Sequence, residues 1–181
     1  RAPTNARSFS FNSYFFSSEY PEYVCSTFND QFITLVDTPS GTPQPIPNPI
    51  DKNLTTYIDL STGTKWPVGI NIAKGTNLFA VCDPKVSVSG SPCYEADVNA
   101  KSCSLGVTDL AGTGWEPGTG ANACPGGGGT YWLTVAGNVI PGQIVEVRFA
   151  IFDVGDTTLD SLALLDGFKW LPNATLPGTG G

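Results

Sequence analysis

The sequence contains no histidine and no methionine, and charged residues make up only 14% of its 181 residues. Without histidine, the chain holds neither a Ser-His-Asp nor a Cys-His catalytic arrangement, and no zinc, iron or copper site with histidine ligands. Glycine and proline are abundant, at 21 and 15 residues, which disfavours a long helical bundle. Hydrophobic residues make up 40% of the chain, which is enough to fill a core and argues against disorder.

Positive charge is also scarce, with 9 basic against 16 acidic residues and a formal net charge of −7. Nucleic acids and anionic membrane surfaces attract the opposite sign, so the charge disfavours both as partners. Cations, neutral glycans and other proteins remain. The sequence has no run of 18 apolar residues, so we expect no membrane insertion. The chain begins at Arg1 with no initiator methionine and no signal peptide, as expected of a processed chain or a segment cut from a longer precursor.

The five cysteines include no CxxC pair, which argues against a zinc ribbon or a thioredoxin-like site. Four of them lie between positions 82 and 124, in a stretch with little apolar patterning that crosslinks would help to hold. We therefore predict an oxidising compartment, two disulfides and one remaining thiol. The pairing stays open among Cys25, Cys82, Cys93, Cys103 and Cys124. The alternative is a cytosolic protein with reduced, buried cysteines.

Short apolar segments separated by glycine and proline turns predict an all-β fold. Alternation and composition indicate strands over residues 8–16, 28–36, 55–60, 68–72, 78–81, 130–135 and 143–153, with a further apolar segment over 161–170. The proline-rich residues 37–49 are expected to form a loop, and residues 82–129 a long disulfide-rich loop region. The sequence therefore predicts one antiparallel, jelly-roll-like β-sandwich over residues 1–170 and a linker-like tail over 171–181. In a jelly roll the terminal strands commonly come together.

Carboxylates gather in two places, and pairing of the terminal strands would bring them into one neighbourhood. Calcium takes six to eight oxygen ligands, usually on a turn, so we predict a structural calcium site whose ligands are drawn from Asp153, Asp156, Asp160, Asp166, Glu19 and Asp30. The spacing is not that of an EF-hand. The alternative is a pair of acidic turns whose side chains cap backbone groups without a metal.

Aromatic side chains in loop-like segments suggest a binding surface. Flat aromatic faces stack on sugar rings, and neighbouring carboxylates and amides read the hydroxyls. The predicted ligand-binding residues are Trp115, Glu116, Trp66 and Tyr94. Core packing is the alternative for each tryptophan, and we expect it for Trp132 and Trp170, which lie in strand-like sequence.

Two glycine-rich segments carry weaker signals. The run Gly126–Gly129 is not a P-loop, because no Gly-Lys-Ser/Thr follows it, so it is expected to be a flexible connection or a site of close backbone packing. Leu176–Gly180 matches the L-P-x-T-G pattern that sortases read. An unstructured linker is the favoured interpretation of this segment, with an anchoring signal, an added tag or chance as alternatives.

The terminal parts of the chain resemble the bacterial choice-of-anchor L domains. The motifs that carry the resemblance follow in the order 12–24 (NSYFFSSEYPEYV), 28–32 (FNDQF), 111–116 (AGTGWE), 128–134 (GGTYWLT), 149–156 (FAIFDVGD), 159–161 (LDS) and 165–168 (LDGF). The likeness is greatest to the cysteine-containing members typical of myxobacteria. The resemblance implies a bacterial protein that is secreted or lies on the cell surface. Domains of this family precede C-terminal anchors of various types, and the resemblance implies no defined chemical activity. The sequence departs from the commoner members at Cys25, where glycine is usual.

These observations predict a non-catalytic extracellular domain for surface binding or adhesion, whose partner is a glycan or a surface protein. One alternative is a purely structural or self-assembling module of a larger surface protein, joined through edge strands or an unpaired cysteine. A second is a carboxylate-dependent, glycan-active enzyme, for which Glu22 or Glu116 with Asp160 would be the acids. Neither the oligomeric state nor the ligand follows from the sequence.

Overall fold

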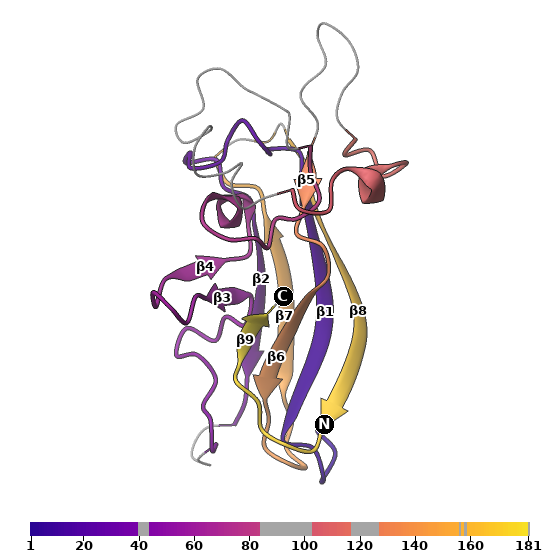
Figure 1. Ribbon diagram of the computed structural model, residues 1–181. Helices are drawn as coiled ribbons and strands as arrows, with labels where there is room; N and C mark the ends of the chain where they lie inside the picture. Colours follow the sequence, from indigo (N-terminus) through magenta and orange to yellow (C-terminus); the bar gives the residue numbers. More distant parts are fainter. Residues whose placement is uncertain (40–43, 84–102, 117–126, 156, 158, 181) are drawn as a thin grey trace, which may run out of the picture.

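The computed structural model describes residues 1–39, 44–83, 103–116, 127–155, 157 and 159–180. Within these ranges the regular secondary structure consists of strands and two short 3₁₀ helices (Figure 1). The elements are β1 (Ser8–Ser17), β2 (Gln31–Asp37), β3 (Thr56–Ile58), β4 (Lys65–Pro67), η1 (Ile70–Lys74), η3 (Thr108–Leu110), β5 (Gly128–Gly129), β6 (Leu133–Asn138), β7 (Glu146–Phe152), β8 (Ser161–Leu171) and β9 (Gly178–Gly180). The all-β prediction is confirmed. None of the helical segments described is long and apolar enough to cross a membrane.

The larger sheet has seven strands and is organised around β1. β1 pairs with β6 and β5 along one edge and with β8 along the other, and β9, β3 and β4 continue the sheet beyond β6. The predicted meeting of the terminal strands is therefore confirmed. Every pair is antiparallel except β3 with β9, which are parallel. The jelly-roll connectivity stays a prediction.

The smaller sheet consists of β2 and β7, which Figure 1 shows behind the larger sheet. Alternation in β2 puts Phe32, Thr34 and Val36 on its buried face. The ring of Phe149 on β7 packs edge-on against Phe11 of β1, with 5.4 Å between the ring centroids. The two sheets therefore enclose an apolar core, as period-2 sequences with one buried face require.

Two predicted strands are wrong. Residues 68–72 do not continue as a strand, because Ile70–Lys74 turn into η1. A side chain at Gly69 would overlap the Asp30 carbonyl oxygen, at 2.4 Å, and the Ile70 amide donates a hydrogen bond to that same oxygen at 3.2 Å. This close approach starts the helical turn, which buries Ile70 and Ile72 completely. In residues 78–81 the structure has only an isolated bridge between Val81 and Gly129.

The C-terminal residues expected to be linker-like instead fold back onto the larger sheet. Gly178–Gly180 form β9 between β3 and β6. The Thr179 hydroxyl donates to the Leu54 carbonyl oxygen at 3.0 Å, and Asn138 exchanges two hydrogen bonds with the backbone of Thr175. A strand this short has no detectable alternation, which is why the sequence did not predict it. Much of the sortase-like pattern is consequently held in a sheet.

Candidate functional site

The outer face of β1 carries an aromatic layer that is separate from the core between the sheets. Tyr14 and Phe16 are buried there with Val81 and Leu110, under the segment of residues 103–116. The Trp115 ring lies 5.4 Å from that of Phe16, and the Tyr14 ring is stacked on Phe16 at 4.1 Å. We call Tyr14, Phe16, Trp115, Tyr131 and Trp132 the outer aromatic cluster.

Two members of the cluster present large faces to solvent. Tyr131 is 42% exposed and Trp132 is 37% exposed, and both rings pack edge-on against Tyr14 at 5.8 and 5.5 Å. The prediction that Trp132 lies in the core is therefore wrong. Leu133 begins β6 and faces inward, so its neighbour Trp132 points to the opposite face. Trp170, in contrast, packs against the core as predicted.

The backbone at Tyr131 is held in a conformation that aromatic residues rarely adopt. Its φ is +69°, in the left-handed region, where a non-glycine residue costs of order 1–3 kcal/mol. The buried Thr130 hydroxyl donates to the Tyr131 carbonyl oxygen at 2.8 Å and accepts from the Phe15 amide at 3.1 Å. Such strain persists where the surroundings fix it, and it clusters at functional sites. In this protein the left-handed backbone at Tyr131 exposes two consecutive aromatic side chains, those of Tyr131 and Trp132, to solvent.

The glycines before this segment permit its close packing. A Cβ at Gly127 would lie 2.5 Å from the Trp115 ring, one at Gly128 would lie 2.6 Å from Phe79, and one at Gly129 would lie 2.7 Å from Tyr14. Close backbone packing, one of the two expectations for this run, is therefore the observed role of the described glycines. It brings residues 127–130 directly against the aromatic cluster.

Two polar atoms inside the cluster lack partners. Among the described residues, the Tyr14 hydroxyl and the Trp115 indole nitrogen Nε1 are buried without a hydrogen bond. Burial, with the nearby Asp109 carboxylate as a smaller contribution, raises the pKa of the Tyr14 phenol. An unpaired buried polar group costs about 1–3 kcal/mol, so their presence on one small surface calls for an explanation beyond packing.

Polar side chains follow the aromatic cluster along the same face. In the strand register, Asn12 lies opposite Thr134 on one side and opposite Asp166 on the other. The Thr134 hydroxyl donates to the Asn12 amide oxygen at 3.3 Å. Residues directly opposite in an antiparallel pair share a face. The Asn12 amide, the Thr134 hydroxyl and the Asp166 carboxylate therefore lie on the face of Tyr14 and Trp132, two residues farther along the strands.

Glu116, one of the predicted ligand-binding residues, secures its own loop. Its carboxylate accepts from the Gly112 amide, and from the Gly114 amide at 2.9 Å. Backbone hydrogen bonds, the largest from the amide of Glu116 itself and the next from Gly112, hold the pKa of Glu116 below its usual range. The loop in turn carries Trp115, which is half-buried.

The remaining predicted aromatic residues do not join this cluster. Trp66 lies on β4, at the opposite end of the sheet order from β1, and is half-buried against the inner core. A Cβ at Gly75 would overlap its ring, at 2.5 Å. Tyr94 lies outside the described residues.

The two acidic segments meet, as the pairing of the terminal strands implied. Asp30 is fully buried; its Oδ1 accepts from the Val154 amide at 3.0 Å and its Oδ2 from the Ser161 hydroxyl at 2.6 Å. The Glu19 carboxylate, 1% exposed, accepts from the Asp30 amide at 3.0 Å. The Ser18 amide donates to the Asp160 carbonyl oxygen at 3.0 Å. We call this arrangement the acidic junction.

The predicted calcium ligands are only partly brought together. Asp153 and Asp160 are exposed near the junction, whereas Asp166 lies five positions beyond Ser161 on β8, roughly 16 Å along an extended strand. Asp156 lies outside the described residues. Among the residues that the structure describes, no group of three or more acidic, cysteine or histidine side chains is arranged to hold a metal.

The cysteines are at least partly oxidised, as predicted. Cys82 and Cys103 form a disulfide that crosslinks positions 21 apart. Cys25 is also disulfide-bonded, and the remaining two cysteines, Cys93 and Cys124, lie outside the described residues.

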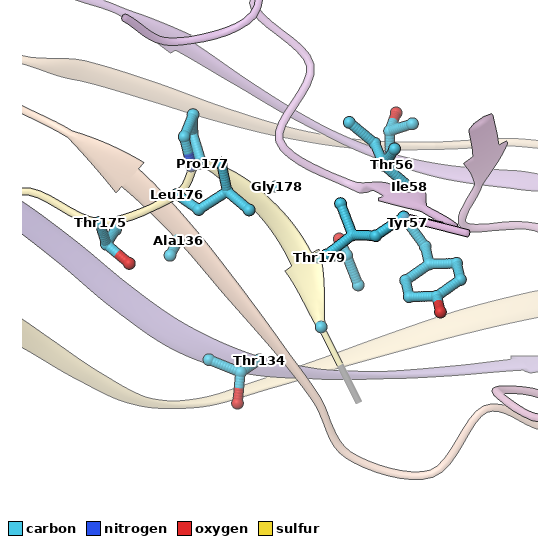
Figure 2. A pocket seen from close by; sticks show the side chains of 12 residues that line it. Thr56, Tyr57, Ile58, Thr134, Ala136, Thr175, Leu176, Pro177, Gly178 and Thr179 are labelled. Carbon is cyan, nitrogen blue, oxygen red and sulfur yellow. The ribbon is translucent and has the colours of Figure 1, made fainter. Parts of the chain in front are cut away.

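A shallow groove of about 310 Å³ lies beside β9 (Figure 2). Its lining comes from β3 and the nearby Leu60, from β6 and from the C-terminal residues Thr175–Gly180, and it contains no charged side chain. Threonine hydroxyls and short apolar groups make up most of the lining that Figure 2 labels. Because one wall is the folded C-terminal tail itself, we interpret this groove as the junction between that tail and the neighbouring strands of the sheet, and not as a ligand site.

Comparison with known proteins gives one match. The family model described as the choice-of-anchor L domain matches residues 3–168. No curated protein matches the chain, and no solved structure matches it. Tyr131 and Trp132 lie beside loop-like sequence but were not among the predicted ligand-binding residues, because core packing was expected for Trp132. The available signal was two adjacent aromatic residues separated from a glycine run by Thr130 alone.

Proposed function

The chain belongs to the choice-of-anchor L domain family, whose domains are surface-associated and non-enzymatic. From this premise we propose that it binds a glycan through the outer aromatic cluster. The observation that carries the proposal is the strained Tyr131 backbone, which exposes two adjacent aromatic faces on a rigid sheet. Sites that stack on ligands need aromatic surfaces placed before the ligand arrives, because ordering them on binding costs affinity.

The polar side chains beside the cluster support a glycan as the ligand. Trp132 and Tyr131 supply apolar faces of the kind on which sugar rings stack. Asn12, Thr134 and Asp166 supply both hydrogen-bond donors and acceptors on the same face. In this interpretation Glu116 acts indirectly, by holding the loop that carries Trp115.

We expect Trp132→Ala to weaken glycan binding at least tenfold, because a stacked aromatic ring contributes a large buried area at the centre of such a site. The measurement is binding of purified protein to a panel of neutral and acidic polysaccharides, followed by titration of the best ligand. The matched control is Phe152→Ala, which removes a ring of 48% exposure on β7. Binding that Phe152→Ala reduces as strongly as Trp132→Ala, or that neither variant changes, would contradict this site.

A partner protein is the second candidate for the same surface. Leu162 and Leu164 lie opposite Phe16 and Tyr14 on β8, and they are 38% and 42% exposed. Exposed leucines beside aromatic rings are typical of the apolar centre of a protein interface. The variant Asp166→Ala distinguishes a glycan from a protein ligand. In a glycan site it removes a group that binds sugar hydroxyls, whereas in a protein interface Asp166 lies only at the polar rim.

A structural calcium ion at the acidic junction stays a prediction. It is supported by the hydrogen bonds that join Val154 to Asp30 and Asp160 to Ser18, the neighbour of Glu19. We expect EDTA to lower the melting temperature and millimolar calcium, but not magnesium, to restore it, because a ligand that binds only the folded state stabilises it. Identical unfolding curves in EDTA and calcium would assign Glu19 and Asp30 to hydrogen bonding alone.

A further inference from the structure

Strand β7 has a ladder partner on one side only in the part of the chain that the structure describes. That partner is β2, and the other edge of β2 is hydrogen-bonded to residues 52–54 and 68. The small sheet is thus closed beyond β2 and open beyond β7. Natural edge strands are usually protected by a proline, a bulge or an inward-pointing charge. The β7 sequence, EVRFAIF, has no proline, its register with β2 is unbroken, and its inward positions are Val147, Phe149 and Ile151.

The space beside this open edge is apolar and only partly covered. Phe149 and Ile151 of β7 share the inward face with Thr34 and Phe32, yet they are 46% and 43% exposed. Leu165 of β8 lies opposite the inward-facing Ser13 and is 43% exposed. These residues line two adjoining hollows of about 220 and 400 Å³ between β7 and β8.

Phe168 completes this surface on β8. Its ring is stacked on the fully buried Phe9 at 5.6 Å, yet the side chain is 52% exposed. We call Phe149, Ile151, Leu165 and Phe168 the open groove. Side chains that point between two sheets and remain half-exposed indicate that, among the described residues, the smaller sheet has no strand opposite β8. In Figure 1, β8 lies at the far edge of the larger sheet, away from β2.

We propose that a second copy of this chain closes the open groove, with β7 pairing antiparallel with β7 of that copy about a twofold axis. The two small sheets then join into one four-stranded sheet, β2–β7–β7–β2. With the axis at Phe149 the whole of β7 is paired, and Val147 lies opposite Ile151 of the second copy. The same surface serves both copies, as a twofold dimer requires. This inference does not depend on the proposed glycan binding, which uses the other face of the larger sheet.

The area of the open groove suits such a dimer. At about 150–200 Å² for a large side chain, the exposed fractions of its four residues leave roughly 300 Å² of apolar surface per copy. Two copies would cover roughly 600 Å². Since such interfaces are about 60% apolar, the total buried area would be about 1,000 Å², at the lower limit for a specific interface. The expected dimer is therefore reversible and dependent on concentration.

The charge on the edge favours a copy of β7 over a charged partner strand. The chain has a net charge of −7, which on its own disfavours self-association. At the β7 edge, however, Arg148 Nε forms an ion pair with Glu146 at 2.5 Å, so the edge is locally neutral. A neutral strand with apolar residues at alternate positions fits an apolar groove with a neutral rim, and β7 itself is such a strand.

The test is the mass of the full chain by sedimentation equilibrium, from micromolar to sub-millimolar concentrations. We expect the mass to rise from 19.0 kDa toward twice that value. Arg148→Glu places like charges along both edges and should weaken the dimer at least tenfold. The matched control is Lys65→Glu, which makes the same charge change on β4 and should leave it unchanged. Ile151→Lys adds an inward-pointing charge and should also give a monomer, with thermal unfolding at low concentration as the check that each variant is folded.

Three outcomes would overturn the proposal. The first is a monomer throughout the concentration range, which would leave the groove to a strand from a different protein. The second is a dimer that Arg148→Glu weakens no more than Lys65→Glu does. The third is a dimer that is covalent in nonreducing electrophoresis, which would assign association to a cysteine. Loss of glycan binding in Trp132→Ala with an unchanged dimer, and the converse in Arg148→Glu, keep this proposal separate from the binding site.

Discussion

Replacing Asp30 by alanine is expected to cost about 3 kcal/mol of unfolding free energy, a large share of the roughly 5–15 kcal/mol that holds a typical domain folded. The Asp30 carboxylate is fully buried and accepts hydrogen bonds from Val154 and Ser161, which are 124 and 131 positions away. Hydrogen bonds to a charged group contribute about 1.5–3 kcal/mol each, and alanine leaves both partly buried donors without this acceptor. For a chain of this size, the melting temperature should fall by roughly 6–12 °C.

Two further variants make this result specific. Asp30→Asn keeps an oxygen for the Val154 amide, and the Ser161 hydroxyl can rotate to accept from the new NH₂ group, so it should cost less than Asp30→Ala. Asp160→Ala removes an exposed carboxylate near the same junction and should change stability by less than about 0.5 kcal/mol. All three are measured by chemical unfolding in EDTA, so that no metal contributes. An Asp30→Ala loss as small as that of Asp160→Ala would show that the junction is not held by these hydrogen bonds.

Asp30 also shows where sequence reasoning about this chain succeeds and where it stops. The cluster containing Glu19 and Asp30 was detectable, because charged residues make up only 14% of this sequence, and its approach to Val154 and Asp160 followed from the pairing of the terminal strands. The partners of Asp30 were not detectable. Its donors are a backbone amide and a serine hydroxyl, and any residue could supply that amide. The residue types alone therefore suggested a metal as readily as a hydrogen-bond network.

Whether a strand could be predicted from the sequence depends on its length. β1 and β8 have 10 and 11 residues, so their apolar patterns were visible in the sequence. β4, β5 and β9 have only two or three residues each, and their pairing is decided by what surrounds them. Trp132 was assigned to the core because its strand was recognised. Which face of that strand is covered depends on residues 103–116, whose path no periodic pattern indicates.

The second large effect concerns the crosslink at the start of that covering segment. We expect the double variant Cys82→Ala/Cys103→Ala to lose about 3 kcal/mol, because freeing a closed loop of this length restores conformational entropy to the unfolded chain. Both cysteines are buried in the inner core cluster, and the Tyr20 hydroxyl lies 3.1 Å from Cys103 Sγ, so lost packing adds to the entropic cost. Ser104→Ala, an exposed neighbour, is the control and should remain within about 0.5 kcal/mol of the unaltered chain.

The consequence should extend from stability to the binding surface. The disulfide fixes Cys103, whose amide donates to the Phe79 carbonyl oxygen at 3.0 Å, and the following residues carry Leu110 and Trp115 onto Phe16 and Tyr14. Without the crosslink, this segment should open at a lower denaturant concentration than the sheets unfold. Tryptophan fluorescence, with Trp115→Phe to identify the signal, should then change before the far-ultraviolet circular dichroism of the strands does. Coincident transitions would instead mean that the segment is held by its apolar contacts alone, and that the disulfide stabilises the fold as a whole without positioning the outer aromatic cluster.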